Sequence, residues 1–74
     1  MTDRSNRFRA SLHGHYWYVD DFDLQARRER DYRTDADGMR WLCGNYFKSE
    51  SQCVTASRHI HEVIAAVHEA TDAS

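Results

Sequence analysis

Apolar and polar residues alternate in short stretches of the first half of the chain, and recur every three or four residues in the second half. The stretch HYWYV (His15 to Val19) combines aromatic and β-branched residues without a helical period, which predicts a strand. Because side chains alternate along a strand, Trp17 and Val19 share one face, which we expect to point to the core. Tyr16 and Tyr18 share the other face, where we expect an exposed aromatic patch.

A hairpin is expected after this strand. The turn is the acidic segment from Asp20 to Asp23, because aspartate side chains accept hydrogen bonds from nearby backbone N–H groups. Residues 24–32 predict a charged return strand. Their residue types also suit a helix, but a helix of about nine residues with almost no apolar face would be unstable.

The middle of the chain predicts a loop and a third strand. Residues 33–38 are polar and end in an Asp-Gly turn signal. Residues 39–43 place Met39, Trp41 and Cys43 on one side, which favours a short strand facing the core. Gly44 and Asn45 then end it, since both residue types readily adopt positive φ.

The C-terminal third predicts a helix. Ser49 and Gln52 match a capping box, so the helix should begin at Glu50 and run to about Ala70. Its apolar positions form one stripe at helical spacing, namely Cys53, Ala56, Ile60, Val63, Ile64 and Val67.

These elements predict an α+β fold, in which a small antiparallel sheet of two or three strands packs against one C-terminal helix. We expect a flexible N-terminus over residues 1–11, a single domain over 12–70 and a tail over 71–74. The expected core consists of Trp17, Val19, Trp41, Phe47, Cys53, Ile60, Val63, Ile64 and Val67.

Charge and composition narrow the function. The 74 residues include 12 acidic and 10 basic side chains, a formal net charge of -2, which gives no overall attraction to phosphate backbones or anionic lipids. No apolar run approaches the roughly 20 residues of a membrane span, and the N-terminus lacks the apolar core of a secretion signal. We therefore expect a cytoplasmic protein with no membrane contact. Cys43 and Cys53 are then free thiols, whereas in an exported chain they could form a disulfide.

The histidines do not make a convincing metal site. His59 and His61 point to nearly opposite sides of a helix, and His61 and His68 lie about 10.5 Å apart along its axis, too far for one zinc ion. His13 and His15 could share a strand face, but two imidazoles leave a metal site one or two ligands short. We expect no metal and no cofactor.

No pattern indicates catalysis either. Both cysteines are expected to face the core, and the acidic residues sit in turns without the spacing of an acid and base pair. The segment QARRERDYR could instead grip nucleic acid, through Arg27, Arg28, Arg30, Tyr32 and Arg33. Neighbouring acidic residues dilute this charge, so an exposed edge strand is the simpler interpretation, and nucleic-acid binding stays open as the alternative function.

Two stretches, HYWYVD and GNYFKSESQ, resemble a family of short uncharacterised phage, prophage and mobile-element proteins. Such proteins have an aromatic first strand, a hairpin, a variable middle and a GN-x-F segment before a C-terminal helix. The matching residues are Tyr16, Trp17, Tyr18, Val19, Asp20, Gly44, Asn45, Phe47 and Ser49. The resemblance implies that Gly44 and Asn45 turn the chain and that Phe47 packs beneath the helix start. Phe22 and Asp23 stand where such hairpins usually carry a glycine, and residues 29–39 match nothing in the family.

The resemblance and the lack of a catalytic pattern predict a non-enzymatic phage-type protein that binds and modulates a host protein in the host cytoplasm. Its concrete form would be an anti-CRISPR or another anti-defence inhibitor, with a CRISPR-Cas or other nuclease component as partner. Its expected contact residues are Asp20, Asp21 and Asp23 of the acidic turn, with Tyr16 and Tyr18. An exposed aromatic patch of this kind would also favour a homodimer.

Overall fold

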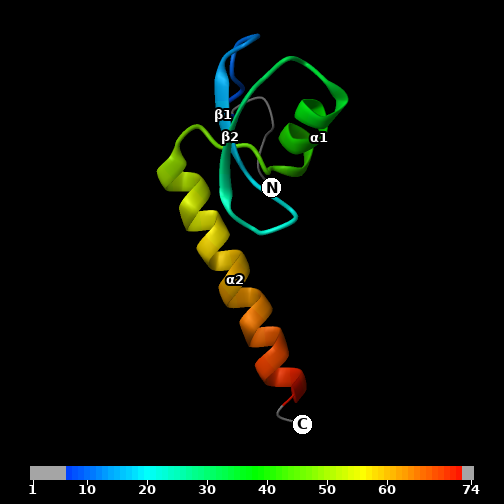
Figure 1. The fold of residues 1–74 in the computed structure, drawn as a ribbon, viewed down its shortest axis with the longest axis vertical. Coiled ribbons are helices and arrows are strands. Elements are labelled where there is room, and N and C mark those ends of the chain that lie inside the picture. The colour runs from blue at the N-terminus through cyan, green and yellow to red at the C-terminus, as the bar shows by residue number, and fades with distance from the viewer. Residues whose placement is uncertain (1–6, 73–74) are drawn as a thin grey trace.

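A computed structural model describes residues 7–72 of the chain. The elements follow in the order β1 (His15–Val19), β2 (Ala26–Arg30), α1 (Asp35–Cys43) and α2 (Glu50–Asp72), as Figure 1 shows. One antiparallel sheet and two helices make a small α+β fold, which confirms the predicted fold class. The long helix α2 extends well beyond the sheet, so the molecule measures 49 × 27 × 23 Å.

β1 and β2 form the predicted hairpin. Their register pairs Tyr16 with Glu29 and Val19 with Ala26. In the turn, the Asp20 carboxylate accepts a hydrogen bond from the Phe22 backbone N–H at 2.8 Å. Aspartate thus fixes the turn as predicted, and the return strand covers the centre of the expected segment.

Helix α1 occupies the segment in which a loop over residues 33–38 and a third strand over residues 39–43 were predicted, so both predictions are wrong. Thr34 is its N-cap: the Thr34 hydroxyl accepts from the Asp37 N–H, and the Asp37 carboxylate accepts from the Thr34 N–H. Gly44 closes the other end with a left-handed φ of 88°. These two caps stabilise a nine-residue helix. The alternation of apolar residues over 39–43 had predicted a strand in its place. Cys43, at its end, is exposed and does not face the core.

The segment after α1 pairs with the second edge of β1. Trp17 and Phe47 exchange backbone hydrogen bonds of 2.9 and 2.7 Å. The Asn45 side-chain amide extends this pairing, because its oxygen accepts from the Val19 N–H at 2.7 Å and its nitrogen donates to the Val19 carbonyl at 2.8 Å. β1 is therefore hydrogen-bonded along both edges. β2 pairs with one edge, and the Phe47 backbone and the Asn45 side chain pair with the other.

One face of β1 is covered by an aromatic cluster. Tyr16 is completely buried and stacks on Tyr46 with ring centroids 4.0 Å apart, beside Ala10. Tyr18 is half-buried, and the Arg40 guanidinium lies 3.9 Å from its ring centroid. The expected exposed patch of Tyr16 and Tyr18 is therefore wrong, because the sheet is covered on both faces and not on one.

The packed region begins before Leu12, where we expected the domain to start. The Ala10 N–H donates to the Tyr46 hydroxyl at 2.9 Å, and the Trp41 indole donates to the Phe8 carbonyl at 3.1 Å. Residues 7–11 thus belong to the fold. The remainder of the expected flexible N-terminus, residues 1–6, and residues 73–74 of the expected tail lie outside the described residues.

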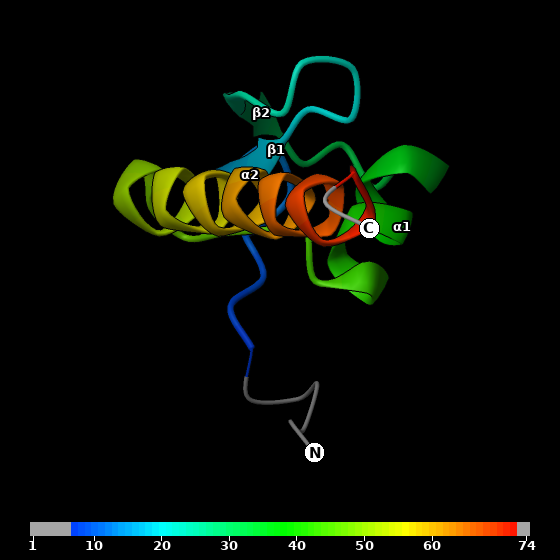
Figure 2. The same cartoon turned by 90° about the horizontal axis from the view of Figure 1, so that it is seen from below.

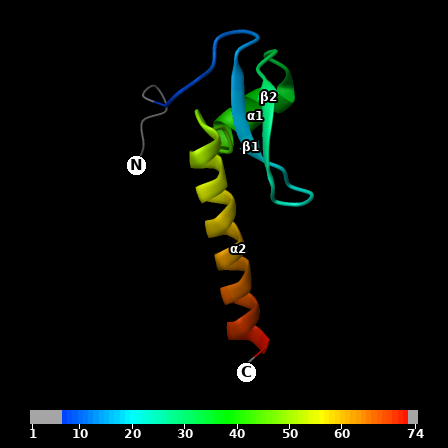
Figure 3. The same ribbon diagram turned by 60° about the vertical axis from the view of Figure 1, so that its left-hand side comes forward.

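Helix α2 begins at Glu50 as predicted and ends two residues later than expected. Its first part packs on the opposite face of the sheet, where Cys53 and Ser57 are buried. The Ser57 hydroxyl donates to the Leu24 carbonyl, which ties the helix to the hairpin. Figure 3 shows the first turns of the helix beside β1.

The second part of α2 leaves the sheet, contrary to the predicted core. Four side chains expected inside are 36–62% exposed, namely Ile60, Val63, Ile64 and Val67. Length explains the error, since 23 helical residues span about 34 Å whereas a five-residue strand spans about 17 Å. Of the other expected core residues, Val19 and Cys53 are buried, and Trp17, Trp41 and Phe47 are partly buried.

Candidate functional site

The first candidate is the buried polar group beneath β1. The Tyr16 hydroxyl donates to Asp37 at 2.6 Å and accepts from Arg40 at 2.8 Å. Burial, and then the hydrogen bond to Asp37, raise the pKa of Tyr16 far above its usual range. Burial alone would raise the pKa of Asp37, but hydrogen bonds from Tyr16 and Thr34 outweigh it and hold that pKa below its usual range.

A second buried carboxylate lies beside the first. Asp31 is completely buried and accepts hydrogen bonds from Tyr46 at 2.7 Å, Arg33 at 2.8 Å and Arg9 at 3.1 Å. Burial acts to raise the pKa of Asp31, and the hydrogen bonds from Tyr46, the Arg33 backbone and Arg9 reverse the shift and lower it. We call Tyr16, Tyr46, Asp31 and Asp37 together the tyrosine layer.

The tyrosine layer holds the fold together and is not poised for acid–base chemistry. A general acid or base works best with a pKa near the operating pH. Here the carboxyl pKa values are lowered and those of the two tyrosines are raised, so every group keeps one protonation state near neutrality. Its bonds join the N-terminal segment, β1, α1 and the strand-like segment at Tyr46.

The hairpin tip, residues 20–23, is the second candidate. Phe22 is 95% exposed at its apex. Asp20 accepts from the Phe22 N–H, Asp23 accepts from the Gln25 N–H at 3.0 Å, and Arg27 forms ion pairs with both carboxylates. The tip is therefore a fixed turn that presents an aromatic ring among carboxylates. Of the predicted contact residues, Asp20, Asp21 and Asp23 lie in this turn, whereas Tyr16 and Tyr18 lie on the covered face of β1. The prediction did not include Phe22, although an aromatic residue within an acidic turn could have indicated an exposed contact.

The arginines of the alternative nucleic-acid site do not share one surface. Arg27 belongs to the hairpin tip, and Arg33 is held by the buried carboxylate of Asp31. Arg28 and Arg30 are exposed on β2, on the face opposite to that of Arg27. Tyr32, 54% exposed, lies against the His13 ring at 5.4 Å. The predicted stretch is thus divided among four different environments.

The histidines remain separate in the structure. His13 lies in a turn with φ of 70° and not in a strand, so it does not share a strand face with His15. His59, His61 and His68 are exposed along α2. Among residues 7–72, no group of three or more His, Cys, Asp or Glu side chains is placed to hold a metal ion.

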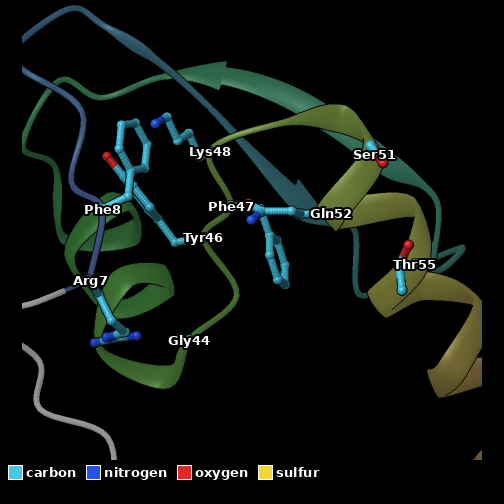
Figure 4. Close-up of a pocket in the computed structure, with 9 residues that line it drawn as sticks. All are labelled: Arg7, Phe8, Gly44, Tyr46, Phe47, Lys48, Ser51, Gln52 and Thr55. Atoms are coloured by element: carbon cyan, nitrogen blue, oxygen red, sulfur yellow. The ribbon is translucent and has the colours of Figure 1, made fainter.

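A shallow pocket lies between the N-terminal segment and the start of α2 (Figure 4). Phe8 and Tyr46 lie together at one end, with ring centroids 5.9 Å apart. Arg7 lies beside Gly44, and its guanidinium covers the Trp41 ring at 4.6 Å from the centroid. The Arg7 guanidinium is thus already stacked on the Trp41 ring, and in this structure it stabilises the fold.

The third candidate is the exposed part of α2, which we call the distal half, residues 60–72. Its apolar side chains continue from a groove at the sheet, lined by Val19, Leu24, Phe47 and Ile60. A further hollow is lined by Ile60, Val63 and Ile64 with His59. In Figure 2, the view from below, the hairpin lies on one side of α2, whereas Figure 1 shows that the distal half projects past both the hairpin and α1. An exposed apolar surface of this kind is typical of a contact with another chain.

Both cysteines are free thiols; Cys43 is exposed and Cys53 is buried. Burial raises the pKa of the Cys53 thiol, which makes it a poor nucleophile. Within the described part of the chain, neither helix is long and apolar enough to cross a bilayer.

Comparison with known proteins gives no assignment. No family model, no curated protein and no solved structure matches this chain. The exposed surfaces, which are the hairpin tip and the distal half of α2, are therefore the guide to function.

Proposed function

We propose that this chain is a non-enzymatic, phage-type binding protein that contacts a host protein through the hairpin tip and so modulates it. The observation that carries the proposal is the exposure of Phe22 on a turn already fixed by hydrogen bonds. Aromatic side chains dominate the energetics of many interfaces, and a preformed turn loses little conformational freedom on binding.

The charge of the tip supports a basic partner. Asp20, Asp21 and Asp23 surround Phe22, and within residues 7–72 the cation paired with them is Arg27, so the tip keeps a net negative charge. Such a tip suits a basic groove, for example the nucleic-acid channel of a nuclease. An anti-CRISPR or other anti-defence inhibitor is the concrete form of the proposal, and the resemblance to phage proteins supports a bacterial host as the source of the partner.

The test is a phage interference assay in host cells that carry defined defence systems, with and without the protein. We expect the wild-type chain to restore plaque formation against at least one system, and Phe22→Ala to lose most of this effect. Leu12→Ala is a matched control, because Leu12 is another apolar side chain that is 56% exposed but lies outside the tip. Unchanged immunity across the systems, or full activity of Phe22→Ala, would contradict the proposal.

A further inference from the structure

We infer that the distal half of α2 pairs with the distal half of a second copy of this chain, and that the two helices run antiparallel in the homodimer. This inference goes beyond the proposed function, because it does not use the hairpin tip. It also replaces the homodimer expected from an aromatic patch, since Tyr16 is buried.

The spacing of residues along one face of α2 carries the inference. Cys53, Ser57, Ile60, Ile64, Val67 and Thr71 follow one another at steps of four and three residues. This is the spacing of a helix-pairing seam, in which every side chain faces the same neighbour. Cys53 and Ser57, the first two members, are buried against the sheet. In the first half of the helix the sheet is therefore the partner of this seam. Beyond the sheet it continues with Ile60, Ile64 and Val67, which are 36%, 42% and 58% exposed.

The position of the sheet determines the direction of pairing. The sheet covers the seam near Cys53 and Ser57, so a second helix running parallel in register would collide with it. An antiparallel helix meets only the distal half. From Ile60 to Thr71 the steps of four, three and four residues read the same in both directions. Ile64 of one copy then lies level with Val67 of the other.

The chemistry of the seam favours an identical partner. Between Ile60 and Thr71 the acidic residues are Glu62 and Glu69. Because each residue turns the helix by 100°, both lie on the opposite side of the helix from Ile64. Two copies therefore bring together β-branched side chains without bringing like charges together. The 13 residues concerned span about 18 Å, and pairing would supply this half of the helix with the apolar packing from which helices in proteins gain most of their stability.

The first test is the mass of the untagged chain by sedimentation at about 0.1 mM, a concentration that populates any dimer of micromolar Kd. We expect a dimer for the wild type and a monomer for Ile64→Asp. Ala65→Asp is the control, because it adds the same charge one residue away, on a different and exposed side of the helix. Ala65→Asp should remain dimeric, and circular dichroism should show that both variants are folded.

The second test gives the direction of the helices. In a Cys43→Ser background, Ile64→Cys and Val67→Cys proteins are oxidised separately and as a mixture. Antiparallel pairing predicts a disulfide between the two variants in the mixture, and a lower yield when each is oxidised alone. A monomeric wild type, a dimer that survives Ile64→Asp, or stronger cross-linking of each variant to itself would overturn the inference.

Discussion

The tyrosine layer and the distal half of α2 differ in what surrounds their side chains. In the tyrosine layer the tyrosines and the aspartates bond to one another and to arginines, within a cluster closed from solvent. Along the distal half, Ile60 still lines the groove at the sheet, whereas Val63, Ile64 and Val67 are 62%, 42% and 58% exposed beyond it.

This difference separates stability from recognition. A chain of this size buries a limited share of its surface, and here the completely buried positions include a tyrosine and an aspartate. Charged hydrogen bonds therefore take over part of the role that apolar packing plays in larger domains. The apolar residues of α2 that the small sheet cannot reach remain available for another chain. Substitutions in the tyrosine layer should change folding, and those in the distal half should change association.

The largest effect is expected for Asp31→Ala. The substitution leaves Arg9, Arg33 and the Tyr46 hydroxyl without their buried acceptor, and should lower the free energy of unfolding by about 3 kcal/mol. Urea denaturation measures it. Asp21→Ala, in the exposed hairpin tip, is the control and should change stability by less than about 0.5 kcal/mol. Equal effects of the two substitutions would contradict the role of the tyrosine layer.

Acidification should weaken the same layer. The folded-state pKa values of Asp31 and Asp37 are below their unfolded values, so both carboxyls stabilise the fold above the unfolded value of about 4. This contribution falls as the pH drops below about 4 toward the folded pKa values. Denaturation midpoints measured between neutral and acid pH should follow this course in the wild type, and more weakly in Asp37→Asn. A midpoint that rises on acidification would contradict the account.

A pair of identical truncations compares the packed and the exposed apolar residues directly. Val19 is 4% exposed and Val67 is 58% exposed. At about 0.1 μM protein, below a micromolar Kd, Val19→Ala should destabilise the monomer by about 2 kcal/mol, and Val67→Ala by less than about 0.5 kcal/mol. Chemical denaturation of both variants is the measurement. A large loss for Val67→Ala in the monomer would mean that the distal half packs on its own chain.

The smallest effects concern the glycine inside α1 and the glycine that caps it. Gly44 has φ of 88°, so Gly44→Ala should cost about 1 kcal/mol. Gly38 lies inside the helix, and no atom lies within 4 Å of the position that an added methyl group would take, so Gly38→Ala should stabilise the protein by up to about 1 kcal/mol. Thermal unfolding should therefore shift in opposite directions. Shifts of the same sign would contradict the assignment of α1 and its cap.

Local patterns predicted the hairpin and the start of α2, because the aspartate turn and the Ser49 cap act within a few residues. Helix α1 was missed, although Thr34 and Asp37 carry the spacing of a capping box. The burial of Tyr16 and the strand-like role of Asn45 could not be predicted, because they depend on partners far along the chain. Of the expected contact residues, the acidic turn lies at an exposed tip, whereas Tyr16 lies in the core.

Hydrogen exchange along α2 tests most directly the claim that its two halves have different roles. Amide protection should be measured by mass spectrometry at about 0.1 μM and about 0.1 mM protein, concentrations that lie below and above a micromolar Kd. Protection around Cys53 and Ser57 should be the same at both concentrations, since the sheet provides it. Protection from Val63 to Val67 should be low in the dilute sample and rise in the concentrated one. Strong protection of both halves at both concentrations would contradict the account.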